Sequence, residues 1–203
     1  MSAGEPRVQP LPAAELDDDA RAALVAGFGE EYTAGVETGA SPYPNVVATM
    51  VRNPTIAAGW WRWNNVLFRK LALDKQLMEL AVLRVSVGTG AAYEWAQHVR
   101  MGRRVELTDD TIVAVGDGTA GPYEWTPVQA AVLDATDELV RDHVISDATW
   151  ARLAEHLDDR VIMELVYVVG SYTCLAMAFN SFGLQLDDDL AEFPPLPRPS
   201  ARP

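Results

Sequence analysis

The sequence contains a single cysteine, Cys174, among its 203 residues. An intrachain disulfide needs two cysteines and a thiolate metal site needs several, so neither can form within one chain. The chain has 3 histidines without paired spacing, and such a pattern does not predict a metal site. We therefore expect no metal site, and a reducing cytoplasm is the expected location.

The N-terminus lacks a basic segment followed by an apolar one, and no run of about 18 apolar residues occurs. A signal peptide and a membrane span are therefore not expected. The formal net charge is -13 and the pI is about 4.5, so nucleic acids and anionic membranes are poor partners because they repel an acidic surface. The glycine-rich motifs of nucleotide-binding proteins and the GxSxG motif of hydrolases are also missing.

The chain is long enough for one domain with a sizeable core, or for two small similar halves that share a core. We predict a single domain over residues 1–203, with an extended N-terminal arm over about residues 1–13. The tail over about residues 194–203 is rich in proline and is not expected to be helical.

Apolar residues recur with the spacing of helices, and no strand pattern of any length is present. Capping signals mark several helix starts: Asn53 before Pro54, Thr108, Thr126 before Pro127, and Ser146. The fold class predicted is all-α. Expected helices cover residues 17–27, 45–50, 54–71, 77–104 with a break, 109–115, 127–143, 147–157 and a last long helix from Asp158 or Asp159.

The stretch from Leu77 to Arg104 is predicted to form a helix, a hinge at Gly88 and Gly90, and a second helix. Glu94 and His98 are one helical turn apart and share a face. Such a pair is often only a solvated surface pair. Glu79, however, lies in an apolar run, so its carboxylate needs a partner, and His98 or Arg84 can provide one.

These residues resemble the carboxymuconolactone decarboxylase and alkyl hydroperoxidase D family. Peroxidase-type members have a glutamate, eleven residues, a cysteine, two residues, a second cysteine, three residues and a histidine. In that frame Glu79 and His98 are matched, whereas Ala91 and Glu94 occupy the two cysteine positions. The run from Tyr93 to His98 is similar to the YEWxxH variant of the decarboxylase-like branch. The resemblance covers roughly residues 40 to 190.

The resemblance implies an enzyme for decarboxylation of a lactone acid, or for a related elimination or isomerisation, without a cofactor. The candidate catalytic residues are Glu79, Glu94 and His98, because the reaction needs a positioned acid and base. The candidate substrate-binding residues are Arg84, Tyr93, Trp95 and Arg100. A thiol peroxidase needs a nucleophilic thiolate, which Ala91 and Glu94 do not supply. A helical oligomer that binds a small molecule without catalysis is the remaining alternative.

Two further patterns concern assembly. Residues 159–165 echo residues 74–80 at an offset of 85 residues, which favours two pseudo-repeated helix-hinge-helix halves, with chemistry in the first only. Trp60, Trp61 and Trp63 crowd one helix; they are core residues, a pocket wall or an interface. With the family resemblance, they predict a symmetric homo-oligomer, whether dimer, trimer or hexamer. Cys174, among apolar neighbours, is expected to be buried and inert.

Overall fold

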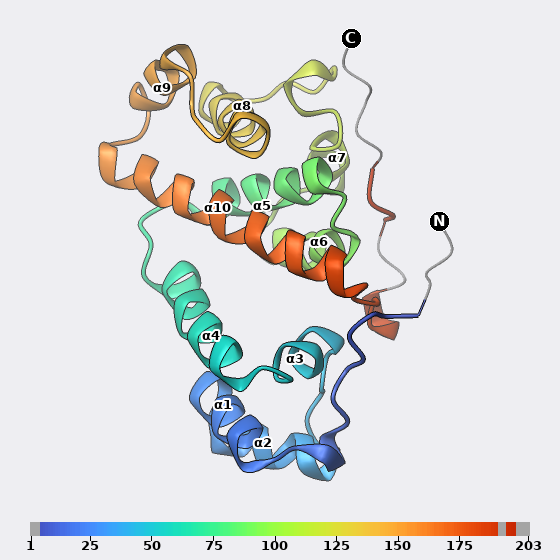
Figure 1. The fold of residues 1–203 in the computed structure, drawn as a ribbon. Coiled ribbons are helices and arrows are strands. Elements are labelled where there is room, and N and C mark those ends of the chain that lie inside the picture. Colours follow the sequence, from blue (N-terminus) through green and yellow to red (C-terminus); the bar gives the residue numbers. More distant parts are fainter. Residues whose placement is uncertain (1–4, 191–193, 198–203) are drawn as a thin grey trace. The chain divides into compact units, whose positions relative to one another are not determined.

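The computed structural model describes residues 5–190 and 194–197, and every regular element in this part of the chain is a helix (Figure 1). The predicted all-α fold class is therefore confirmed. Contacts divide the chain into two compact units. Unit 1 contains the described part of Met1–Leu71 together with Ser181–Asp187, and unit 2 contains Ala72–Asn180 and the described residues after Asp187. A single domain over residues 1–203 stays a prediction.

Unit 1 is built from helices, some of which begin at residues whose side chains cap them. After a 3-10 turn, η1 (Ala13–Glu15), come α1 (Asp18–Phe28), α2 (Glu30–Thr38), α3 (Asn45–Met50) and α4 (Pro54–Arg69). Asp17 accepts a hydrogen bond from the Ala20 N–H, and Asn53 accepts one from the Ile56 N–H. These caps satisfy amides that have no partner within the helix. The sequence patterns did not predict α2.

The tryptophans of α4 are accounted for largely within unit 1. Trp61 is 7% exposed and belongs to the apolar core, where its ring centroid lies 4.8 Å from that of Phe28. Trp60 is partly buried against the same core. Trp61 is therefore a core residue, and Trp60 packs against the same core. The tryptophans of α4 are no longer the main support for an interface.

The N-terminal arm is extended and is held by its own chain over the described residues 5–12. The Arg7 N–H donates to the Phe182 carbonyl at 2.8 Å, and the Leu11 N–H donates to the Ala48 carbonyl at 2.8 Å. Residues 1–4 lie outside the described part of the chain, as do residues 198–203 of the predicted tail. Residues 194–197 of the tail are not helical, as expected.

Unit 2 is arranged around one helix that is buried along most of its length. The elements are α5 (Lys75–Thr89), α6 (Ala92–Arg104), α7 (Asp109–Ala114), η2 (Gly118–Ala120), α8 (Pro127–Asp142), α9 (Asp147–Ala154), α10 (Asp159–Phe182) and η3 (Asp188–Leu190). All residues of α5 from Leu77 to Val87 are buried. Because α5 packs against both α6 and α8, even its polar side chains lie inside the unit.

The hinge between α5 and α6 depends on one glycine rather than two. Gly88 is part of α5, which continues to Thr89, whereas Gly90 ends the helix with φ 70°. This left-handed conformation is strained for residues with a Cβ atom. The short reversal brings α6 back along α5 and places Glu79 near His98.

The second copy of the sequence echo forms no hinge. Helix α10 continues through Gly170 without a break. Glu164, which matches Glu79 at the repeat offset, accepts hydrogen bonds at 2.7 Å from the Ala72 and Leu73 amides. The second copy is therefore part of a continuous helix, and its carboxylate binds the amides just before the first copy.

By length and composition α10 could also cross a membrane. The sequence showed no uninterrupted apolar run because Glu164, Gly170 and polar residues occur within the helix. This is weak evidence, since a core helix passes the same test, and Leu165, Val168 and Ala176 of α10 are fully buried.

Candidate active site

The centre of the candidate site is a buried pair between α5 and α6. His98 Nδ1 lies 2.7 Å from Glu79 Oε2, and the two residues are 5% and 4% exposed. A carboxylate can only accept a hydrogen bond, so it favours the tautomer with hydrogen on Nδ1. Nε2 is then the ring nitrogen that can take up a proton. The predicted juxtaposition of Glu79 and His98 is thus present in the structure.

Glu94 lies one turn before His98 on α6 and has a different environment. It is 2% exposed, and the hydrogen bond described for its side chain is a long one of 3.4 Å from the Ser86 hydroxyl to Oε1. Oε2 is buried without a hydrogen-bond partner among the described residues. Burial raises the pKa of the Glu94 carboxyl well above its usual value, and the Ser86 hydrogen bond opposes this only in part. Glu94 is therefore favoured in its neutral form, which can donate a proton.

Tyr172 is a site residue that the sequence patterns did not reveal. It projects from α10, and its ring meets the His98 ring edge to face, with centroids 4.9 Å apart. Its hydroxyl is buried and has no hydrogen-bond partner in the described chain. Burial, and then the nearby Glu79 and Glu94 carboxylates, raise its pKa well above the usual value. The available signal was a tyrosine hydroxyl in the middle of an apolar helix.

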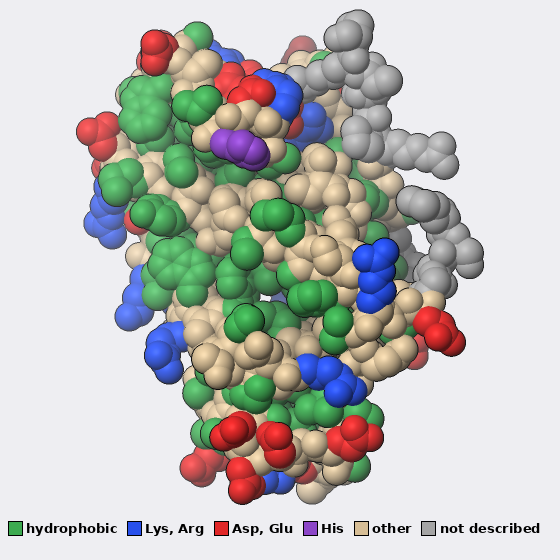
Figure 2. Space-filling view, viewed as in Figure 1, with side chains coloured by type: hydrophobic (Ala, Val, Ile, Leu, Met, Phe, Trp, Pro, Cys, Tyr) green, Lys and Arg blue, Asp and Glu red, His purple; other side chains and the backbone are tan. Residues whose placement is uncertain are grey.

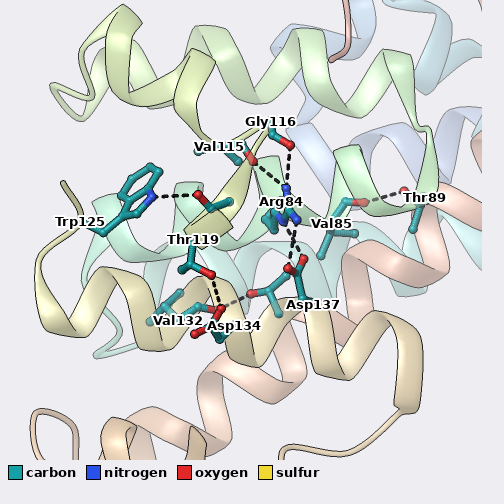
Figure 3. A network of polar contacts seen from close by, with 12 residues as sticks. Arg84, Val85, Thr89, Val115, Gly116, Thr119, Trp125, Val132, Asp134 and Asp137 are labelled. Atoms are coloured by element: carbon teal, nitrogen blue, oxygen red, sulfur yellow. Dashed lines mark hydrogen bonds and ion pairs between the residues drawn. The ribbon is translucent and has the colours of Figure 1, made fainter. Parts of the chain in front are cut away.

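Arg84 belongs to a separate network of polar contacts (Figure 3). Its guanidinium binds Asp137 through two hydrogen bonds of 2.6 and 2.9 Å, and it donates to the carbonyls of Val115 and Gly116. A Cβ atom on Gly118 would lie 2.9 Å from the guanidinium carbon, so glycine permits this close approach. The prediction that Arg84 holds a substrate carboxylate is not supported by these contacts, because its donors already bind protein oxygens.

Trp95 and Arg100 have contacts toward the C-terminal segment. The Trp95 indole N–H donates to the Pro194 carbonyl at 2.9 Å, and Arg100 donates to Asp189 at 3.0 Å and to Gln97. Tyr93 is buried, and its hydroxyl accepts a hydrogen bond from Gln97. None of these contacts reaches Glu79 or His98, so the structure supplies no support for substrate binding by these residues.

Cys174 differs from its expected environment. Helix α10 places its side chain at the surface, so the expectation of a buried thiol was wrong. The neighbouring apolar residues did not bury Cys174 because the helix directs adjacent side chains to different faces. The two positions that hold cysteines in the peroxidase-type frame are occupied by Ala91 and Glu94.

Comparison with known proteins identifies the segment that carries the site. Residues 54–138 match the model of the carboxymuconolactone decarboxylase family. This segment belongs to that family. The match includes α5 and α6, and therefore Glu79, Glu94 and His98, but it ends before Tyr172. No curated protein sequence matches the chain.

In the described part of the chain, no group of three or more His, Cys, Asp or Glu residues could hold a metal ion.

Solved structures share the fold of this carboxymuconolactone decarboxylase-like chain. A peroxidase-related protein from Silicibacter sp. TM1040 has a TM-score of 0.73 at 18% identity, covering 95% of this chain and 97% of that one. An AhpD-core protein from Ralstonia eutropha JMP134 has a TM-score of 0.68 at 20% identity, covering 90% and 94%.

The debrominase Bmp8 also shares this fold. Its structure as a cysteine-to-alanine variant with 2,3,4-tribromopyrrole has a TM-score of 0.70 at 15% identity and covers 91% of this chain and 93% of that one. At these identities the comparisons establish an AhpD-like fold, while the reaction has to be inferred from this chain's own site.

Proposed function

We propose that the protein is a cofactor-independent lyase or isomerase that uses acid and base chemistry on a small organic acid or lactone. The observation that carries this proposal is the buried Glu79–His98 pair one helical turn from a carboxyl group favoured in its neutral form. A base and an acid with different protonation states are what proton transfer between two positions of one substrate requires.

In the proposed reaction each group has a separate task. His98 Nε2 removes a proton from a carbon atom next to the substrate carbonyl, while Glu79 orients the imidazole and stabilises the imidazolium that forms. Loss of CO₂ can generate the same type of carbanion when the substrate is a lactone acid. The imidazolium or Glu94 then returns a proton to carbon, so the reaction needs no oxidant.

A comparison of neutral and carboxylate-bearing lactones tests this function. α-Angelica lactone, a neutral unsaturated γ-lactone, should be converted to its conjugated isomer, which is measured by ultraviolet absorbance. A γ-lactone that carries a carboxylate should release CO₂ if the lyase reaction applies. No acceleration over buffer with either class would reject the proposal and favour a non-catalytic binding protein.

Peroxide turnover is expected to be absent, although the Cys174 side chain is exposed on the single chain. A peroxidase also needs an activated thiolate in the site and a means of resolving it. Peroxide consumption with a dithiol reductant should therefore equal background. Turnover that disappears in Cys174→Ser would contradict the assignment of chemistry to α5 and α6.

We further propose a symmetric homo-oligomer, now supported mainly by α10. Met163, Tyr167 and Met177 are 57%, 59% and 60% exposed, and their spacing places them on one face of the helix. Figure 2 shows apolar side chains along the surface over this helix. Light scattering should give a multiple of 22.2 kDa, and Met177→Arg should lower that mass. A wild-type monomer at micromolar concentration would reject this proposal.

A further inference from the structure

Near His98, unit 2 contains two buried polar atoms without a described hydrogen-bond partner. Glu94 Oε2 and the Tyr172 hydroxyl are both buried, and neither has a hydrogen-bond partner among the described residues. Buried polar atoms are almost always paired, since an unpaired one costs roughly 1–3 kcal/mol of stability. Two such atoms beside one imidazole indicate that something other than the protein completes their hydrogen bonds.

The two groups converge on His98 from different helices. Glu94 precedes His98 by one turn on α6, and Tyr172 reaches the imidazole from α10 with its ring edge to face. Besides burial, the Glu79 and Glu94 carboxyl groups act on the pKa of Tyr172, so both lie near its hydroxyl and all four side chains share one region. A substrate whose reacting carbon meets His98 therefore has its carbonyl oxygen within the same surroundings.

We propose that Glu94 and Tyr172 form a two-donor oxyanion site, which binds the carbonyl oxygen of a neutral lactone or ketone as that oxygen becomes an enolate. This inference rests on the proposed function and names its substrate class. When His98 removes the proton from carbon, the C–H electron pair forms a C=C bond and the carbonyl π electrons move to oxygen. The oxyanion accepts hydrogen bonds from the Glu94 carboxyl and the Tyr172 phenol, and the proton on His98 returns to another carbon.

The electrostatics of the site support donors rather than acceptors. Burial raises the pKa values of both Glu94 and Tyr172, so both groups keep their hydrogens near neutral pH. A carboxylic acid held neutral by an apolar site can donate to an oxyanion. The substrate oxygen is then stabilised without a cation. Arg84 does not supply one, because it is paired with Asp137. A neutral carbonyl compound therefore suits this site better than a substrate carboxylate, which would add a second negative charge beside Glu79.

Binding of 4-nitrophenol tests the inference without catalysis. Its phenolate oxygen resembles an enolate oxygen, and binding can be measured by absorbance titration. We expect the wild type to bind 4-nitrophenolate and Tyr172→Phe to bind it about 10–100-fold more weakly, as expected for loss of a hydrogen bond to a charged group. Tyr167→Phe, an exposed tyrosine on the same helix, should bind like wild type.

Further variants separate the possible results. Glu94→Leu should also weaken binding by at least about 10-fold, whereas Glu94→Gln, which keeps a donor, should bind more tightly than Glu94→Leu. 4-Nitroanisole, which has no phenolate oxygen, should bind far more weakly than 4-nitrophenolate. The inference is overturned if the wild type does not bind the phenolate, if nitroanisole binds equally well, or if Tyr172→Phe leaves the affinity unchanged.

Folding does not obscure this test, since Tyr172→Phe removes only an unpaired hydroxyl and is expected to unfold at the wild-type temperature or above it. Failure of the oxyanion site and failure of the proposed function give different results. Replacing His98 with asparagine should lower lactone turnover by ~10²–10⁴ and still permit phenolate binding. Turnover that persists without phenolate affinity would reject the oxyanion site alone, and phenolate binding without any turnover would reject the enzymatic function alone.

Discussion

His98→Asn is expected to lower kcat/KM for the lactone reaction by ~10²–10⁴, the usual effect of losing a positioned general base. Asparagine places its amide nitrogen near the position of Nδ1, so it can still donate to Glu79 Oε2. It has no atom in the position of Nε2. The variant therefore removes the proposed base without leaving the buried Glu79 carboxylate unpaired, which His98→Ala would do.

His156→Asn is the matched control for this variant, because His156 is exposed and lies outside the described site. Its kcat/KM should equal that of the wild type. Glu79→Gln should lower activity as well, since the imidazole loses the carboxylate that orients it and stabilises its charge. Circular dichroism should show the same helical content in all three variants. An active His98→Asn protein with wild-type kcat/KM would remove the imidazole from the mechanism.

Asp137→Ala is expected to reduce the free energy of unfolding by ~3–5 kcal/mol, the largest stability effect that we predict. The Arg84 and Asp137 side chains are only 9% and 14% exposed. Without Asp137, the Arg84 guanidinium stays buried with an uncompensated positive charge and keeps its hydrogen bonds to the carbonyls of Val115 and Gly116. Urea denaturation followed by circular dichroism measures the difference.

Asp142→Ala provides the comparison on the same helix, since Asp142 pairs with Arg141 at the surface. Exposed ion pairs contribute about 0–1 kcal/mol, so this variant should unfold at nearly the wild-type urea concentration. Asp137→Asn keeps the side-chain shape and removes the charge, and it should be destabilised less than Asp137→Ala. If Asp137→Ala and Asp142→Ala are equally stable, the Arg84–Asp137 pair is not a structural centre of unit 2.

Much of the helical framework could be predicted from the sequence because its signals are local. Asn53, Thr126 and Ser146 each cap the helix that follows them, as predicted. The Glu79–His98 contact was also predictable, since a short hinge joins two helices that are close in sequence. Gly88 was misread because glycine within a helix and glycine at its end have the same composition signal, and only the backbone shows that Gly90 adopts the left-handed conformation.

The remaining site features depend on contacts between residues far apart in the chain. Tyr172 meets His98 only because α10 packs against α6, and no pattern within α10 specifies that packing. From the sequence, Arg84 could bind a substrate carboxylate. In the fold, its guanidinium binds Asp137 of α8 instead. Cys174 was assigned to the core from its neighbours in sequence, whereas burial of a helix residue depends on which face its partners cover.

Deuterium incorporation from D₂O into α-angelica lactone is the measurement that tests proton transfer most directly, because it detects each removal of a proton from carbon even when no net product accumulates. Proton NMR should show the wild type exchanging the carbon-bound hydrogen next to the carbonyl much faster than buffer. His98→Asn should exchange it ~10²–10⁴ times more slowly than the wild type. Exchange by His98→Asn at the wild-type rate, or none above buffer by the wild type, would contradict the assignment of Glu79, Glu94 and His98 as a proton-transfer site.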